Sequence, residues 1–270
     1  MRVRNGYKPQ PASAATSARL HRFRRQALPA SIDWRSNNGK NIVTPVKDQG
    51  QCGDCFAFAS TGALEGQNAL KCGTLVSLSE EQITDCSSAY GNQGCNGGNM
   101  AYVYQYVHDD TTQGTTPAIR QLGLDTETDY PYTAGQTAYP GTCKYGSITP
   151  NSAGTGNGFV NVAATEAALE QAVATIGPIS VAIDAGSTDA VVQAWNNYAS
   201  GVYTGPCTNG GNNVDHAVLV VGYGTDPTAG PYWIIKNQWS TNWGMNGYMY
   251  LARNSNNLCA VASNPTYPLV

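Results

Sequence analysis

The spacing of apolar residues changes along this chain, and that change constrains the fold more than any other feature. As far as residue 177, small and apolar residues recur with helical spacing, which predicts helices at 55–70, 77–86, 99–108 and 165–177. Beyond it, β-branched and aromatic runs separated by glycine and proline predict strands at 179–184, 216–224, 232–239 and 247–253. The order indicates an α+β protein with a mainly helical subdomain over 28–157 and a mainly β subdomain over 158–270.

The first 27 residues differ from the rest in composition and charge. They contain seven basic residues and no acidic one, whereas the remainder holds eight basic and 18 acidic residues. Their Ala-, Ser- and Pro-rich composition predicts a flexible basic arm over 1–27. The acidic body argues against nucleic acid as a partner, because phosphate binding needs clustered lysine and arginine.

The cysteine content indicates the cellular compartment. Eight cysteines in a chain with only 12% charged residues are typical of an oxidising environment. The chain has no run of 18 apolar residues, which argues against a membrane span, and MRVRNGYKPQ has no apolar signal core. We therefore expect a lysosomal, vacuolar or secreted protein whose signal peptide is not present in this chain.

Two cysteines stand three positions apart in GQCGDCFAF, residues 50–58. Cys52 and Cys55 could be half of a zinc site, a redox dithiol, or two thiols with separate roles. Zinc would need a second pair of ligands, and the three histidines are scattered, so no metal or other cofactor is expected. A redox pair would need a preceding strand, whereas the preceding TPVKDQGQ has a loop composition.

The third interpretation makes Cys55 a catalytic thiol. It lies where a loop enters a predicted helix, and the N–H groups and dipole of a first helical turn stabilise a thiolate. A thiolate needs a proton partner, for which His216 is the candidate. Asn237, expected on a later strand, would orient the imidazole. Asp215 is the weaker candidate, because adjacent strand residues point to opposite faces.

The segments that contain these residues resemble the papain-like cysteine protease family, the cathepsin group. The matching stretches follow the family's order from about residue 28 to the C-terminus: LPASIDWR, VTPVKDQGQCGDCFAFA, LVSLSEEQITDC, GCNGGNM, GLDTETDYPY, GPISVAI, VDHAVLVVGYG and YWIIKNQWSTNWGMNGY. The resemblance implies the papain-like fold, in which the active-site cleft lies between a helical and a β-barrel-like subdomain. It also implies the activity of a cysteine endopeptidase. Residues 1–27 would then be a propeptide remnant or a tag, and because they lack an apolar pattern they would cover this cleft only weakly.

The resemblance assigns roles to five residues. Cys55 would attack the peptide carbonyl and form an acyl-enzyme, and His216 would protonate the leaving amine. Asn237 would hold the imidazole, and Trp239 would shield that contact. Gln49 would donate its amide N–H to the oxyanion, where preorganised donors stabilise the developing charge.

The resemblance also implies a substrate cleft and three disulfides. Gly97 and Gly98 would let a substrate backbone approach closely, because no Cβ intervenes. The pocket for the second side chain before the scissile bond (P2) would be apolar, which predicts leucine, phenylalanine or valine there. Its implied lining is Met100, Ala182, Val214 and Ala217, with Asn264 at its end. The implied disulfides are Cys52–Cys95, Cys86–Cys143 and Cys207–Cys259, which leaves Cys72 as a small buried hydrophobe or an intermolecular link.

Two residues depart from the family's pattern beside the nucleophile, where a small residue and a tryptophan are usual. Asp54 adds a negative charge that raises a thiol pKa, although a carboxylate is also favourable near a helix N-terminus. We expect from it a smaller thiolate fraction at low pH. Phe56 keeps the aromatic bulk but loses the indole donor.

The expected partners are polypeptide substrates and, by resemblance, cystatin-like protein inhibitors, and the chain is expected to be a monomer. Two alternatives stay open. One is a catalytically silent papain-like protein that binds peptides or partners. The other is a dithiol oxidoreductase that uses Cys52 and Cys55.

The segment 109–122 is expected to form a surface loop.

Overall fold

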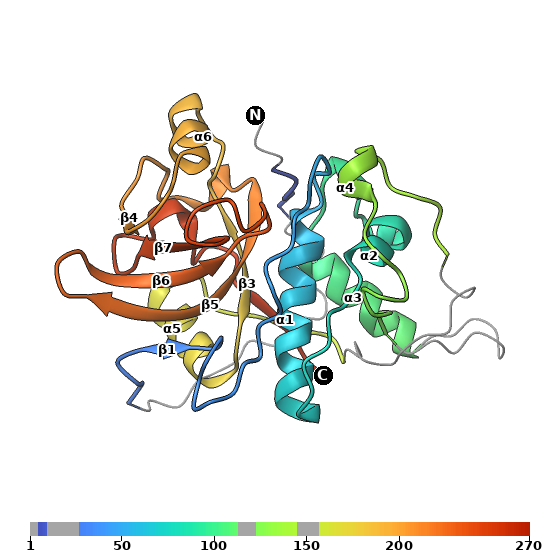
Figure 1. Cartoon of the computed structure of the whole chain (residues 1–270), viewed down its shortest axis with the longest axis horizontal. Helices are drawn as coiled ribbons and strands as arrows, with labels where there is room; N and C mark the ends of the chain where they lie inside the picture. Colours follow the sequence, from blue (N-terminus) through green and yellow to red (C-terminus); the bar gives the residue numbers. More distant parts are fainter. Residues whose placement is uncertain (1–4, 10–26, 113–122, 145–156) are drawn as a thin grey trace.

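The fold is a mixed helix and sheet structure, as predicted. The computed structural model describes residues 5–9, 27–112, 123–144 and 157–270. Figure 1 shows the strands together with helices α5 and α6 on one side, helices α2, α3 and α4 on the opposite side, and the long helix α1 between the two groups. The helices are α1 (Cys55–Cys72), α2 (Glu80–Cys86), α3 (Met100–Thr112), α4 (Ala134–Thr137), α5 (Glu166–Thr175) and α6 (Asp189–Asn196).

The strands form one sheet in the order β2-β8-β3-β5-β6-β7-β4, and β1 also pairs with β5. All pairings are antiparallel except that of β4 with β7. Residue Ile183 at the end of β3 pairs with His216, which fixes His216 as the first residue of β5. The bounds are β1 (Ile32–Asp33), β2 (Phe159–Asn161), β3 (Ile179–Ile183), β4 (Val202–Tyr203), β5 (His216–Asp226), β6 (Gly230–Lys236), β7 (Tyr248–Ala252) and β8 (Thr266–Pro268).

Strand β5 joins the two halves because both of its faces are buried. Val218 and Val220 belong to the core of the β side, whereas Ala217, Leu219 and Val221 belong to the cluster that includes α1. This alternation follows from the two-residue period of a strand. Strand β5 therefore carries His216 to the start of the helix that carries Cys55.

Helix α1 can lie this close to the sheet because small residues face it. A Cβ on Gly62 would come 2.8 Å from the Leu219 side chain. The helix ends at Gly73, which has a left-handed backbone and donates its N–H to the Ala69 carbonyl. Cys72 is the last residue of α1 and is exposed, so the expectation of a buried thiol is wrong.

The predicted helices and strands match α1, α2, α3, α5, β3, β5, β6 and β7 to within a few residues. Helix α6 was not predicted. Strand β6 ends at Lys236, so Asn237 follows the strand instead of lying within it. Of the expected surface loop 109–122, residues 109–112 belong to α3 and 113–122 lie outside the described residues.

Within the described ranges, no helix combines the length and apolar character needed to cross a membrane. The same residues contain no group of three or more His, Cys, Asp or Glu side chains that could hold a metal ion.

Candidate active site

The backbone that leads into α1 is fixed by a disulfide and by a main-chain hydrogen bond. Cys52 is disulfide-bonded to Cys95, and the N–H of Gly53 donates to the Cys95 carbonyl at 3.1 Å. Cys55 then begins α1 and is fully buried. Because Cys52 is bonded to Cys95, the two cysteines of GQCGDCFAF do not form a dithiol pair in this structure. The other disulfides are Cys86–Cys143 and Cys207–Cys259, so the three pairs are those that the resemblance implied.

The imidazole of His216 is held by Asn237 and not by Asp215. The His216 Nε2 lies 2.9 Å from Asn237 Oδ1, which also accepts the backbone N–H of Gln238 at 2.9 Å. Because this atom of Asn237 is an acceptor, His216 Nε2 must carry the proton that it donates to Asn237. The lone pair of the neutral ring is then on Nδ1. His216 Nδ1 is buried and has no hydrogen-bond partner in the described structure. Asp215 instead accepts from Ala185 N at 2.9 Å.

The thiol of Cys55 contacts the backbone next to His216. Its Sγ accepts the backbone N–H of Ala217, the residue after His216, at 3.4 Å. Burial raises the pKa of the Cys55 thiol to about 12 and lowers the pKa of His216 to about 4. With the site buried in this way, both groups are neutral near pH 7.

Trp239 connects the imidazole to Gln49. The ring centroids of Trp239 and His216 are 4.9 Å apart, and Trp239 Nε1 donates to Gln49 Oε1 at 3.1 Å. Gln49 Nε2 donates to the carbonyl of Cys52 at 2.8 Å. These two contacts fix the orientation of the Gln49 amide, with its nitrogen toward the loop that leads into Cys55.

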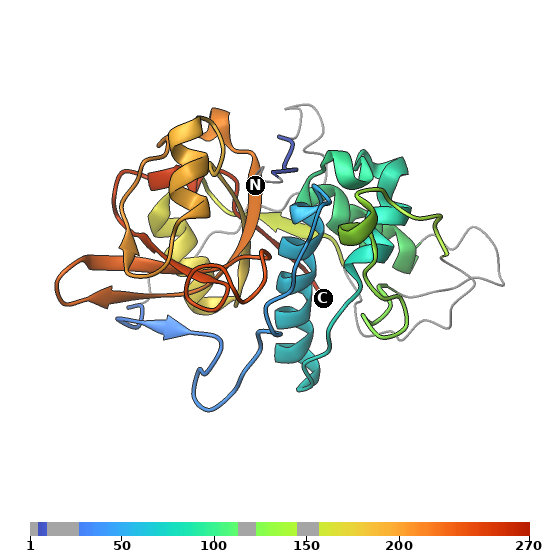
Figure 2. The same cartoon turned by 45° about the horizontal axis from the view of Figure 1, so that its top comes forward.

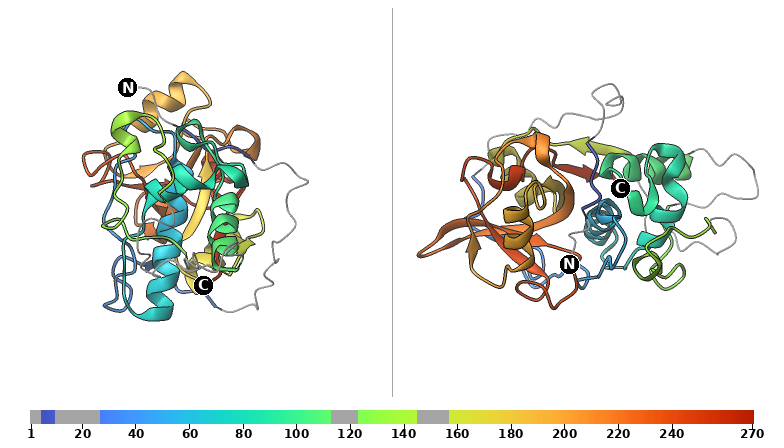
Figure 3. Two further views of the ribbon diagram at one scale, coloured as in Figure 1. Left: turned by 90° about the vertical axis from the view of Figure 1, so that its right-hand side faces the viewer. Right: turned by 90° about the horizontal axis from the view of Figure 1, so that it is seen from above.

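Residues 5–9 lie across this site. Figure 2 and the view from above in Figure 3 show this dark-blue segment between the sheet and the helical part. Tyr7 N donates to Asp215 O at 2.9 Å, and Tyr7 forms a parallel bridge with Gly98. Lys8 N donates to Gly98 O at 2.8 Å, and Gly98 N donates to Gly6 O at 2.7 Å. The segment is therefore bound as an added strand, through its main chain.

The same segment closes over the start of α1. A Cβ on Gly6 would come 1.6 Å from Gly53 O, and a Cβ on Gly97 would come 2.4 Å from Gly6 O. Only glycine fits at these positions while the segment is in place. Burial raises the pKa of the Cys55 thiol, and the backbone N–H of Gly6 lowers it by a smaller amount. The segment therefore lies against the predicted nucleophile.

The side chain of Tyr7 is almost completely buried. Tyr7 is buried in one apolar cluster with four residues of the implied lining, Met100, Ala182, Val214 and Ala217. Its hydroxyl accepts from Asn99 Nδ2 at 3.3 Å. Asn99 is absent from the implied lining, and Asn264 is exposed.

Gly97 and Gly98, which the resemblance implied as lining of a cleft, lie between residues 5–9 and the start of α1. A Cβ on Gly98 would come 2.8 Å from the ring of Phe56 and 2.3 Å from Asn92 Oδ1. The fully buried ring of Phe56 therefore packs directly against Gly98.

The expectation that the N-terminal arm covers the cleft only weakly does not hold for residues 5–9. That expectation rested on the absence of an apolar pattern. The segment is held instead by main-chain hydrogen bonds and by one aromatic side chain, neither of which requires a periodic pattern. The remainder of the arm, apart from residue 27, lies outside the described residues.

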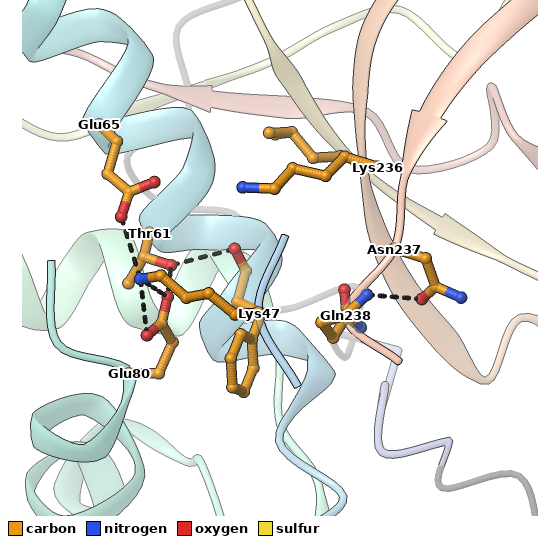
Figure 4. A pocket seen from close by; sticks show the side chains of 9 residues that line it. Lys47, Thr61, Glu65, Glu80, Lys236, Asn237 and Gln238 are labelled. Atoms are coloured by element: carbon orange, nitrogen blue, oxygen red, sulfur yellow. Dashed lines mark hydrogen bonds and ion pairs between the residues drawn. The ribbon is translucent and has the colours of Figure 1, made fainter. Parts of the chain in front are cut away.

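A buried charge cluster behind the site was also missed. Figure 4 shows a small pocket in which Lys47 contacts two glutamates and Lys236 points toward them from β6. Lys47 Nζ lies 2.7 Å from Glu80 Oε1 and 3.2 Å from Glu65 Oε1. Burial lowers the pKa of Lys236 to about 8.

This cluster connects the elements that carry the site. Lys236 donates to Thr44 Oγ1 at 3.0 Å, and Thr44 donates to Glu65 Oε2 on α1 at 2.6 Å. Lys47 is two residues before Gln49, and Lys236 directly precedes Asn237. Breaking a buried ion pair costs about 3–5 kcal/mol, so the cluster resists displacement of these elements.

Comparisons with known proteins agree with this geometry. The family described as "Papain family cysteine protease" matches residues 28–269. A cathepsin L-like peptidase of Aedes aegypti is 46% identical over 90% of the chain and 64% of its own length. Procathepsin L of Mus musculus is 45% identical over 90% of the chain and 66% of its own length. The chain thus spans a little less than two thirds of these relatives.

A solved structure covers nearly all of the chain. The digestive procathepsin L 3 of the Tenebrio molitor larval midgut superposes with a TM-score of 0.79 at 38% identity. The superposition covers 99% of this chain and 77% of that one.

Proposed function

Because the chain belongs to the papain family of cysteine proteases, we propose that it is a cysteine endopeptidase whose nucleophile is Cys55. The observation that carries the proposal is the arrangement of His216. One ring nitrogen is held by Asn237 at 2.9 Å, and the other is buried without a partner beside the start of α1. An imidazole held in this way accepts the proton of a thiol.

In the proposed reaction, the proton of Cys55 Sγ moves to His216 Nδ1 once residues 5–9 have left and water enters the site. The N-terminal end of α1 stabilises the thiolate, and Asn237 stabilises the imidazolium. The thiolate attacks the peptide carbonyl, and the oxyanion is stabilised by the amide of Gln49 and the backbone N–H of Cys55. His216 protonates the leaving amine, and water then hydrolyses the acyl-enzyme.

The proposed substrates are polypeptides with an apolar P2 side chain. The burial of Tyr7 among Met100, Ala182, Val214 and Ala217 supports a pocket that accepts a large apolar or aromatic group. Burial raises the pKa of Tyr7 to about 12, which indicates how poorly this pocket solvates charge. Asn99 is the added contact at the tyrosine hydroxyl.

We predict that cleavage depends strongly on the P2 residue. In peptides that differ only at P2, kcat/KM should be about 100-fold higher for phenylalanine or leucine than for aspartate, because burying an unpaired charge is costly. The measurement is kcat/KM for this peptide series. The enzyme is the full chain carrying Gly6→Ala, a substitution that is expected to displace residues 5–9 and open the site. The same chain with Cys55→Ala is the control. Equal rates for all P2 residues would contradict the assignment of the pocket.

The three disulfides support an oxidising compartment, and a lysosomal, vacuolar or secreted enzyme is proposed on that ground. Cystatin-like inhibitors and a monomeric state remain predictions from the family. The catalytically silent alternative predicts correct disulfides but no reaction of Cys55 with an electrophile.

A further inference from the structure

Asp54, the residue before the nucleophile, is buried in a hydrogen-bond network that the proposed reaction does not use. Its side chain is fully buried, and although it is the N-cap residue of α1 it caps no helix N–H. Its Oδ2 instead contacts Tyr132 OH at 2.8 Å and Thr84 Oγ1 at 3.0 Å. Its Oδ1 is buried without a hydrogen-bond partner in the described structure.

Two of these contacts extend the network to the backbone. Tyr132 OH also lies 3.0 Å from the carbonyl oxygen of Gln49, and Thr84 Oγ1 lies 2.9 Å from the carbonyl oxygen of Glu80. The Asp54 carboxyl is therefore linked through one hydroxyl to Gln49 and through the other to α2. The first link joins the start of α1 to the loop that carries the oxyanion donor.

Four oxygen–oxygen contacts make up this network, and each needs its own proton to be a full hydrogen bond. With Asp54 ionised, the hydroxyls of Tyr132 and Thr84 supply two protons for four contacts. Tyr132 then donates to the carboxylate, and its contact with the Gln49 carbonyl becomes a repulsion between two acceptors. With Asp54 protonated, Asp54 donates to Tyr132, and Tyr132 donates to Gln49 O. The proton on Asp54 thus completes the link between the nucleophile and the oxyanion loop.

The charges that face Asp54 also favour its neutral form. Glu81 on α2 is a nearby like charge, and its carboxylate accepts the N–H groups of Thr133 and Ala134 at 2.8 Å each. On α1, a charged Asp54 raises the pKa of Cys55. The remaining titratable groups are Tyr132 itself and, acting on Tyr132, Glu80, which is paired with Lys47. Burial, the largest effect, raises the pKa of Asp54 to about 7.

We propose that Asp54 is a positioning residue that is protonated in the active enzyme and that switches the site off when it loses its proton. The proposal rests on the proposed function, because the site it controls is that of the Cys55 nucleophile. Loss of the proton has two consequences. It breaks the Tyr132–Gln49 hydrogen bond, and it places a negative charge next to the thiolate. The sequence alone suggested a smaller thiolate fraction at low pH, whereas the network assigns the loss to pH values above about 7.

The substitution Asp54→Asn replaces the titratable carboxyl with an amide, which keeps a hydrogen-bond donor at every pH. An amide nitrogen at the Oδ2 position donates to both Tyr132 and Thr84, which then donate to the Gln49 and Glu80 carbonyls. All four contacts become hydrogen bonds at every pH, with no change of size. Tyr132→Phe instead breaks the link to Gln49 at every pH and is the matched control.

The first readout is independent of activity. In the full chain, the infrared carbonyl band of a protonated carboxylic acid should be present at about pH 6 and disappear as pH rises through about 7. The band is identified as the one that Asp54→Asn removes.

A second readout that does not depend on activity is thermal stability. When the pKa of a carboxyl is raised in the folded state, the folded protein loses stability as pH rises from the unfolded pKa of about 3.9 to the folded value. The melting temperature of Asp54→Asn should therefore exceed that of the parent chain increasingly between about pH 4 and about pH 7.

The third readout is the pH profile of kcat/KM in the full chain carrying Gly6→Ala. The parent should lose about tenfold between about pH 6 and about pH 8.5 relative to Asp54→Asn, since one pKa unit of interaction is a factor of ten. Tyr132→Phe should reduce kcat/KM already at about pH 6 and show a smaller further loss.

The outcomes are distinct. Overlapping profiles for the parent and Asp54→Asn, or no protonated carboxyl band at about pH 6, would overturn the role of Asp54. If the Gly6→Ala chain is alkylated faster at Cys55 than the parent chain but cleaves no peptide at any pH, the proposed function is what fails. In that case the infrared band and the pH profile of Cys55 alkylation still decide the inference.

Discussion

Replacing Gly6 with alanine should increase the alkylation rate of Cys55 by about 10- to 100-fold in the full chain, because overpacking costs about 1–3 kcal/mol. The new Cβ would come 1.6 Å from the Gly53 carbonyl oxygen, and backbone atoms cannot move aside as a flexible side chain can. The segment 5–9 must therefore leave its place or shift. The residues of the enzyme's own site are unchanged in this variant.

The measurement is the second-order rate of Cys55 modification by iodoacetamide, quantified by peptide mapping. The matched control is Gly210→Ala, because a Cβ at Gly210 meets nothing within 4 Å. Its alkylation rate should equal that of the parent chain. An unchanged rate in Gly6→Ala would show that residues 5–9 do not limit access to the thiol.

Replacing His216 with alanine should reduce kcat/KM by about 10³- to 10⁴-fold in the Gly6→Ala chain, because both proton transfers then lack their partner. The ring is fixed between Asn237 and Trp239, and in the described structure its Nδ1 has no hydrogen-bond partner that could take over its role. The thiol must then ionise without an imidazolium, next to Asp54 and Asp215, which both raise its pKa. Its alkylation near pH 7 should therefore fall as well.

The control for this substitution is His108→Ala, which removes a histidine on α3. It should leave kcat/KM within about twofold of the parent, as for substitutions away from a site. A loss in His108→Ala as large as that in His216→Ala would contradict the assignment of the base.

The sequence predicted the elements whose signals are local. Spacing of apolar residues identified α1, α3 and α5, and β-branched runs identified β3, β5 and β6. In SLSEEQITDC, residues 77–86, the spacing of Ser79 and Gln82 predicts a capping box with Ser79 as the N-cap, and the Ser79 side chain accepts the Gln82 N–H at 3.0 Å. The Gln82 side chain, which a capping box would turn back to Ser79, contacts Tyr106 OH instead, because α3 lies beside it.

The predicted catalytic residues are brought together by tertiary structure. His216 and Asn237 are 21 positions apart but join through the β5–β6 pairing, which follows from strand patterns. The roles of these residues came from resemblance, and their geometry is compatible with those roles. Asp215 was correctly ranked below Asn237, because its side chain points to Ala185.

The parts that could not be predicted depend on contacts without a sequence pattern. Residues 5–9 bind through main-chain groups, which every residue has. The network around Asp54 depends on Tyr132, which is 78 positions away, and on a burial that no local pattern reports. The sequence alone suggested an effect of Asp54 at low pH, whereas the network leads to the proposal of an effect above about pH 7.

The most direct test of the central claim is to map the site at which an epoxide probe for cysteine proteases reacts. The full chain carrying Gly6→Ala contains two free thiols among its described residues, the buried Cys55 and the exposed Cys72. We predict one adduct, on Cys55, with Cys52 still bonded to Cys95 and Cys72 unmodified. An adduct on Cys72 alone, or a disulfide between Cys52 and Cys55, would contradict the assignment of Cys55 as the nucleophile.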